Sequence, residues 1–165
     1  TGDASEAPAL PGALRETEEP SDDQVTGTRE VTLSMTLGMG GGGGMGGGGG
    51  PGGGHGGADA LLIDGRSFQA DRIDIRATIG DVEDWTIRNT SVMDHPFHLH
   101  VWPFRVLERS DGGALPPGWK DTVNVPANGS VRIRIPFRDT PGMTVYHCHI
   151  LDHEDRGMMG IIETR

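Results

Sequence analysis

The only cysteine of this 165-residue chain stands between two histidines, in His147-Cys148-His149, and His153 and Met158 follow within ten residues. A thiolate, an imidazole and a thioether on one short segment are the donors of a blue-copper electron-transfer site, in which methionine is the long axial ligand. Zinc sites more often use several thiolates or a closed set of His and Cys. Because the chain offers a single thiol, this segment favours copper over zinc.

A second group of histidines lies upstream, in the segment His95-Pro96-Phe97-His98-Leu99-His100. Side chains of an extended strand alternate between its faces, so histidines two residues apart share a face and Cys148 points away from its two neighbours. The chain can therefore build two metal sites, one on each side. The first would use His95, Cys148, His153 and Met158, and the second would use His98, His100, His147 and His149.

Cys148 joins these two sites covalently, because each neighbouring histidine is one peptide unit away, roughly 3.3 Å along a strand. An electron on the thiolate would thus have a short bonded path toward the second site.

Together with Gly118-Trp119-Lys120-Asp121-Thr122-Val123 and Phe104-Arg105-Val106-Leu107-Glu108-Arg109, the two histidine motifs closely resemble the C-terminal cupredoxin domain of bacterial multicopper oxidases. Spore-coat laccases and periplasmic cuprous oxidases look nearest. The resemblance covers the chain from about Glu30 to Arg165. It implies an all-β, cupredoxin-like Greek-key sandwich or barrel and a copper cofactor.

Carried over position by position, the resemblance implies distinct roles for the histidines. Type 1 copper would bind His95, Cys148, His153 and Met158. Type 2 copper would bind His98, and the type 3 pair would bind His100, His147 and His149. Met159 is a rival axial ligand, although its spacing is one residue longer than the family pattern.

Other residues are weaker candidates. Glu154 matches a family carboxylate that feeds protons to the oxygen site, and a surface acid is the alternative. Asp94, Asp121 and Asp152 could orient a ligating imidazole by accepting its second N–H. The methionines Met35, Met39 and Met45 could dock Cu(I), as in the methionine-rich insert of cuprous oxidases, or could belong to a plain linker. His55 is a poor candidate for a ligand.

In this family the three-copper cluster lies between the first and last cupredoxin domains, and half of its histidines come from the N-terminal domain. This chain supplies only four candidates. It begins at Thr1 without a signal peptide, and we expect it to be the C-terminal part of a longer oxidase. The expected partners are the N-terminal cupredoxin domains, possibly on a separate chain, a small reducing substrate and O₂. The resemblance also implies a periplasmic or extracellular location.

Alternating polar and apolar residues predict strands over residues 30–37, 72–76, 85–88 and 131–135, with the arginines of the last segment facing outward. Asn128-Gly129 and Asp111-Gly112-Gly113 indicate hairpin turns. Leu151 to Arg156 could form one helical turn. The acidic, proline-containing residues 1–28 predict a solvated connector to a cupredoxin domain over residues 29–165. Within that domain, residues 38–57 are almost pure glycine and predict a flexible insert.

The formal net charge of −10 argues against a nucleic-acid partner, which would need a basic patch. No apolar run approaches the roughly 18 residues of a membrane span. The motifs favour an oxidase that couples one-electron oxidation of phenols or low-valent metal ions to reduction of O₂ to water. A stand-alone electron-transfer cupredoxin is the main alternative, but it leaves four histidines without a role. A nitrite-reductase-like protein and a zinc-only site are less favoured.

Overall fold

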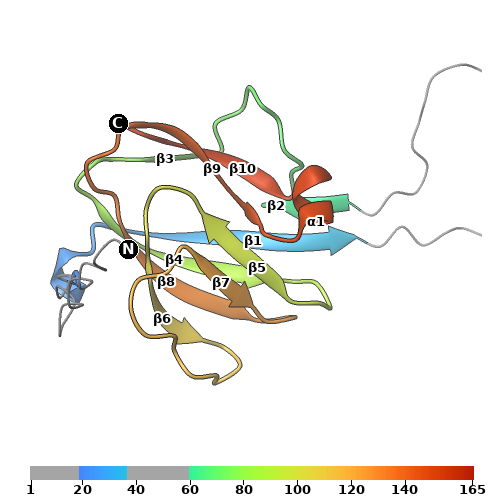
Figure 1. Ribbon diagram of the computed structural model, residues 1–165, viewed down its shortest axis with the longest axis horizontal. Coiled ribbons are helices and arrows are strands. Elements are labelled where there is room, and N and C mark those ends of the chain that lie inside the picture. The colour runs from blue at the N-terminus through green and yellow to red at the C-terminus, as the bar shows by residue number, and fades with distance from the viewer. Residues whose placement is uncertain (1–18, 37–59) are drawn as a thin grey trace, which may run out of the picture.

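The computed structural model describes residues 19–36 and 60–165 (Figure 1). In these residues the chain forms ten strands, one short 3₁₀ helix and one short α-helix. In chain order they are η1 (Asp22–Gln24), β1 (Gly27–Thr36), β2 (Ala60–Ile63), β3 (Ile75–Ala77), β4 (Val82–Asn89), β5 (His95–Leu99), β6 (Arg105–Arg109), β7 (Thr122–Val125), β8 (Ser130–Pro136), β9 (Gly142–Cys148), α1 (Leu151–Asp155) and β10 (Met159–Thr164).

The strands form two five-stranded sheets, ordered β2-β1-β4-β8-β6 and β3-β10-β9-β5-β7. From β5 to β9 each successive strand belongs to the other sheet. Most neighbouring pairs are antiparallel, and β1 with β4 and β3 with β10 are parallel. The all-β, cupredoxin-like fold expected from the sequence is confirmed.

The core lies between the two sheets, where the alternating strands turn their apolar faces toward each other. Trp85 from one sheet meets Tyr146 from the other edge to face, with ring centroids 6.2 Å apart. Both side chains are at most 1% exposed. Each large apolar side chain buried in this way contributes roughly 1.5–3 kcal/mol. This packing holds the strands that carry the histidines.

Both predicted turns exist, but neither closes a hairpin. Asn128 adopts a left-handed backbone conformation with φ 51°, as does Gly112 with φ 69°. The first turn leads from β7 to β8 and the second leaves β6 toward β7, and each connection crosses between the sheets. The prediction of hairpins was therefore wrong. Turn residues specify a local change of direction, and packing decides which sheet receives the next strand.

Arg134 also departs from expectation, because it points away from the core and is nevertheless 5% exposed. Its guanidinium donates to Asp84 Oδ1 at 2.7 Å, to Asp22 Oδ1 at 2.8 Å and to the Pro20 carbonyl at 3.0 Å. The segment that covers it belongs to residues 1–28, for which the sequence predicts a connector. In its described part, that segment packs on the outer face of a sheet.

The glycine-rich residues 38–57, with Met39, Met45 and His55, lie outside the described residues. Strand β1 precedes this segment in the chain and β2 follows it. The last residues of β1 and the first residues of β2 lie near α1 (Figure 1). Met35 of β1 is partly buried and packs against the hydrophobic core.

The strands that carry the two histidine motifs are hydrogen-bonded neighbours. In the antiparallel pair of β5 and β9, Phe97 lies opposite Cys148, and His98 lies opposite His147. Directly opposite residues of such a pair point to the same face. The register therefore places Cys148 on the core side and His147 on the other side, as the alternation predicts. The short helix α1 follows at once and brings His153 back toward Cys148.

Candidate metal centre

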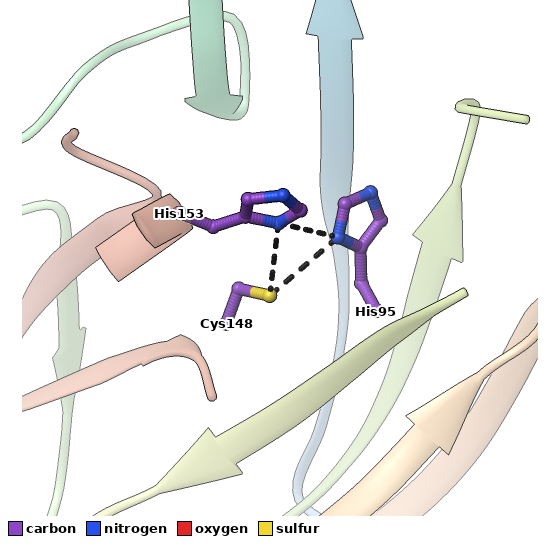
Figure 2. A group of neighbouring side chains, drawn as sticks. All are labelled: His95, Cys148 and His153. Carbon is purple, nitrogen blue, oxygen red and sulfur yellow. Dashed lines mark hydrogen bonds between the residues drawn. The ribbon is translucent and has the colours of Figure 1, made fainter. Parts of the chain in front are cut away.

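His95, Cys148 and His153 converge at one end of the sandwich, and we call this group the thiolate site (Figure 2). Cys148 Sγ lies 3.5 Å from Nδ1 of His95 and 3.6 Å from Nδ1 of His153, and the two Nδ1 atoms are 3.2 Å apart. His95 comes from β5, Cys148 from the end of β9 and His153 from α1. Three elements thus present one donor atom each to a common point.

The spacing of these three atoms fits a small metal ion. The separations place a point about 2.0 Å from each atom, close to the roughly 2.0–2.3 Å of metal–nitrogen and metal–sulfur bonds. Two imidazoles and one thiolate in a trigonal set are the in-plane donors of a blue-copper site. The residues present therefore fit copper.

Burial adjusts the protonation of all three groups. It lowers the pKa of His95 to about 4, with the neighbouring His153 as the second cause. Burial likewise lowers the pKa of His153 and raises the pKa of the Cys148 thiol. The imidazoles are thus neutral and ready to bind at neutral pH, whereas the thiol must lose a proton when a metal enters.

Met158 and Met159 are consecutive residues where β10 begins, so their side chains point to opposite faces of the sheet. Met159 lies opposite His147 in the pairing of β9 with β10, and so shares the face of that histidine. The carbonyl of Met158 accepts the Cys148 N–H at 3.0 Å, and the Met158 side chain is fully buried. The turn before it requires Gly157, whose φ is 104° and whose added Cβ would collide with Ser67 Oγ. Met158 is therefore the methionine on the side of the thiolate site.

The remaining four histidines gather on the opposite side, and we call this group the imidazole face. His98, His100 and His147 present ring nitrogens within 4.8 Å of one another. The ring of His149 lies 5.3 Å from that of His98. His100 and His149 are exposed, and a hollow opens beside His98 and His100. It is lined by His98, Leu99, His100, Val101, Pro103 and Asp121.

Hydrogen bonds orient the ring of His98 on the imidazole face. His98 Nδ1 lies 2.8 Å from the Asp121 carbonyl and 2.9 Å from Thr122 Oγ1. A carbonyl only accepts, so Nδ1 of His98 carries the proton and Nε2 is left free to bind. After His100 the chain turns through Val101, a β-branched residue with a left-handed φ of 74°. Such a conformation costs of order 1–3 kcal/mol and is found mainly at functional sites.

Glu154 reaches the imidazole face from α1. Its Oε2 lies 3.2 Å from Nδ1 of His147, and its side chain is 28% exposed. On the other side of the same ring, Nε2 of His147 lies 3.1 Å from Nε2 of His100. A carboxylate behind a histidine fixes the ring and raises its basicity as a ligand. Glu154 thus contacts both solvent and the imidazole face.

Two of the three aspartates predicted to orient imidazoles have other side-chain partners. Asp94 accepts from Asn124 and from the backbone of Ala127, and Asp152 pairs with Arg156. Asp121 does contact His98, but through its backbone carbonyl. Sequence reasoning instead missed Ser91, whose hydroxyl lies 2.7 Å from Nε2 of His95. Ser91 lies in a loop four residues before His95, and this spacing matches no known sequence motif that would predict the contact.

A Greek-key sandwich with a thiolate and two imidazoles at one end defines a cupredoxin domain. A family model described as multicopper oxidase matches residues 46–165. The chain therefore belongs to the multicopper oxidase family, which implies copper as its metal, and the stand-alone electron-transfer alternative is not favoured.

Individual relatives agree with the family. The chain is 39% identical over 113 residues to multicopper oxidase mco of Staphylococcus haemolyticus, covering 64% of this chain and 25% of that protein. It is 36% identical over 123 residues to a laccase of Bacillus subtilis, covering 62% and 24%. The crystal structure of laccase from Pediococcus acidilactici superposes with a TM-score of 0.72 at 35% identity, covering 97% of this chain and 31% of that one.

The chain thus spans about a quarter of the length of the curated relatives it matches. Among the residues that the structure describes, no helix is long and apolar enough to cross a membrane. The expectation of a periplasmic or extracellular location stays a prediction.

Proposed function

We propose that this chain is the C-terminal copper-binding part of a multicopper oxidase that couples one-electron oxidation of a substrate to four-electron reduction of O₂ to water. The substrate would be a phenol or a low-valent metal ion. The observation that carries the proposal is the placement of two potential metal sites on opposite sides of β9, with Cys148 belonging to one and its neighbour His147 to the other. An electron carrier alone would need only the thiolate site.

The proposal assigns type 1 copper to the thiolate site. His95 and His153 would hold it through Nδ1, Cys148 through Sγ and Met158 through its thioether, in preference to Met159. When bound, copper would supply one-electron redox chemistry at the thiolate site and a three-metal centre for O₂ reduction at the imidazole face. His153 is 7% exposed, and an electron donor would approach its edge from solvent.

On the imidazole face, His98 would bind type 2 copper, and His100, His147 and His149 would bind the type 3 pair. The peptide bonds from Cys148 to its two neighbours would provide the bonded electron path. Glu154 would hold a proton between solvent and His147, where reduction of O₂ to water consumes protons. The exposure of His100 and His149 supports the idea that a second domain covers them. The N-terminal cupredoxin domain would be this partner and would complete the centre.

Copper content and O₂ uptake test the proposal. The chain alone should bind one copper tightly at the thiolate site and become blue. With a partner polypeptide that carries two His-x-His motifs, the complex should hold about four coppers, three of them at the shared centre, and consume O₂ with phenols or Cu(I). One copper per complex and no O₂ uptake with the partner present would instead indicate an electron-transfer protein.

A further inference from the structure

A buried chain of polar side chains stands behind the thiolate site, on the side of His95 that faces away from Cys148. Ser91 Oγ lies 2.7 Å from Nε2 of His95, and Asn89 Oδ1 lies 2.7 Å from Ser91 Oγ. His95, Ser91 and Asn89 are 0%, 3% and 1% exposed. None of the three has access to bulk water, so their hydrogen bonds must be satisfied by one another and by the backbone.

The backbone fixes which way the Asn89 amide points. The Ser91 N–H donates to Oδ1 at 2.9 Å. Nδ2 faces three carbonyls, those of Met93 at 2.8 Å, Pro126 at 3.1 Å and Val125 at 3.2 Å. A backbone N–H cannot accept and a carbonyl cannot donate, so a flipped amide would lose all of these bonds. Oδ1 is therefore the atom that faces the Ser91 hydroxyl.

The direction of the next bond follows. Ser91 Oγ lies near two oxygens that only accept, Asn89 Oδ1 at 2.7 Å and the Met93 carbonyl at 3.1 Å. If the single hydroxyl proton pointed at Nε2, Oγ would face both of these oxygens with lone pairs alone. If the proton goes to one of the oxygens instead, a lone pair of Oγ is left to accept a hydrogen bond from Nε2–H. The second arrangement satisfies more of the buried contacts, and in it Nε2 of His95 is the donor. In a neutral ring the proton therefore sits on Nε2, and Nδ1 presents a bare lone pair toward Cys148.

The loop that holds Ser91 is itself tied to other elements. The N–H of Asn89 donates to the Gly129 carbonyl at 2.8 Å, the N–H of Thr90 to the Leu33 carbonyl at 3.0 Å, and the N–H of Asn128 to the Ser91 carbonyl at 2.9 Å. These bonds attach the loop to β1 and to the turn between β7 and β8. The hydroxyl thus has a fixed position relative to β5, which carries His95.

We propose that Ser91 and Asn89 are positioning residues that fix the tautomer and ring plane of His95, so that Nδ1 is prepared to bind the metal before the metal arrives. This inference rests on the proposed function, in which His95 is a copper ligand. Hydrogen-bond partners behind a ligating histidine typically change metal affinity 10–100-fold when they are removed. Ser91 and Asn89 would act in this way through a neutral relay, with no carboxylate.

Two measurements on the 165-residue chain test this. Long-range ¹H–¹⁵N correlation spectra of the metal-free chain report which ring nitrogen carries the proton. A competition titration between the chain and a chromophoric Cu(I) chelator reports metal affinity. The variants are Ser91→Ala, Asn89→Ala and the conservative Ser91→Thr. Ser110→Ala is the control, because it likewise removes a hydrogen-bonded serine hydroxyl, one that accepts the Ser130 N–H at 2.8 Å outside the thiolate site.

In the wild-type chain, His95 should carry its proton on Nε2. Ser91→Ala and Asn89→Ala should give a mixture of both tautomers and bind Cu(I) 10–100-fold more weakly. Ser91→Thr should restore both readouts, and Ser110→Ala should stay within about twofold of wild type. If Ser91→Ala does not fold, the tautomer of His95 in the wild-type spectrum and the Cu(I) affinity of Ser91→Thr still test the proposal.

A wild-type His95 protonated on Nδ1 would overturn the inference. Equal Cu(I) affinity and an unchanged tautomer in Ser91→Ala would overturn it while leaving the proposed function intact. A wild-type chain with the proton on Nε2 that binds no Cu(I) would support the assigned tautomer and contradict the proposed function.

Discussion

The thiolate site and the imidazole face lie on opposite sides of the same two strands, yet they relate to the fold in different ways. The three side chains of the thiolate site are at most 7% exposed, and Cys148 and Met158 belong to the hydrophobic core. The imidazole face has two exposed histidines and opens into a hollow. Folding of this chain alone brings the donors of the buried site together, whereas under the proposed function the exposed site would be completed by a second surface.

The largest effect should come from Cys148→Ser, which removes the only soft anionic donor of the thiolate site. A hydroxyl does not replace a thiolate for copper, so the blue absorption should disappear completely. Visible absorption after copper loading checks this. His100→Ala, on the imidazole face, is the control and should keep the blue band. A blue Cys148→Ser protein would show that the two sites have been assigned wrongly.

Stability of the metal-free chain should fall at acid pH because of the thiolate site. The pKa of His95 is lowered to about 4 in the folded chain, whereas it is about 6.5 when unfolded. The unfolded chain therefore binds the proton first, and stability declines as pH drops from about 6.5 to about 4. The loss attributable to His95 should reach on the order of 3 kcal/mol.

Urea unfolding of the metal-free chain at a series of pH values measures this loss. His95→Gln cannot bind the proton and should show a shallower decline over the same interval. Bound Cu(I) should also suppress the decline, because it occupies Nδ1. Equal slopes for wild type and His95→Gln would mean that other groups cause the acid sensitivity.

Glu154→Gln should affect only the imidazole face, because its contact is with His147. In the complex with the N-terminal partner, O₂ consumption should slow about tenfold or more, as is typical when a carboxylate behind a metal-bound histidine is lost. The blue absorption should not change. Stopped-flow spectra measure the blue absorption, and a polarographic assay measures the rate of O₂ consumption. A change in the blue band would place the role of Glu154 at the thiolate site.

The smallest effect should come from Val101→Gly at the edge of the imidazole face. Val101 is 54% exposed and strained at φ 74°, so glycine relieves strain and loses little packing. After the greater unfolded-state entropy of glycine is subtracted, the free energy of unfolding should rise by about 1 kcal/mol. Urea unfolding measures this change, and Val92→Gly, at an exposed position without positive φ, should show no such gain. An unchanged or lower value for Val101→Gly would mean that the turn is not strained.

The sequence predicted those features that depend on strand periodicity and on residue chemistry. Alternation alone places Cys148 opposite in direction to His147, and donor chemistry selects the residues of both sites. The sequence alone could not predict that Asn128-Gly129 links two sheets, because the sheet that a strand joins depends on contacts between residues far apart in the chain. Nor could it find Ser91 behind His95, since that contact requires the loop to be held by β1 and by the turn after β7.

The contact between Arg134 and residues 20–22 has a practical consequence for anyone who wishes to express this domain separately. A truncated gene that starts at the first strand, Gly27, would remove the Pro20 carbonyl and the Asp22 carboxylate that bind the guanidinium. Arg134 and Asp84 would then be uncovered on the outer face of the β4–β8 pair. The shortest useful fragment therefore begins upstream of Pro20, and a domain exchanged between related oxidases should carry this segment with it.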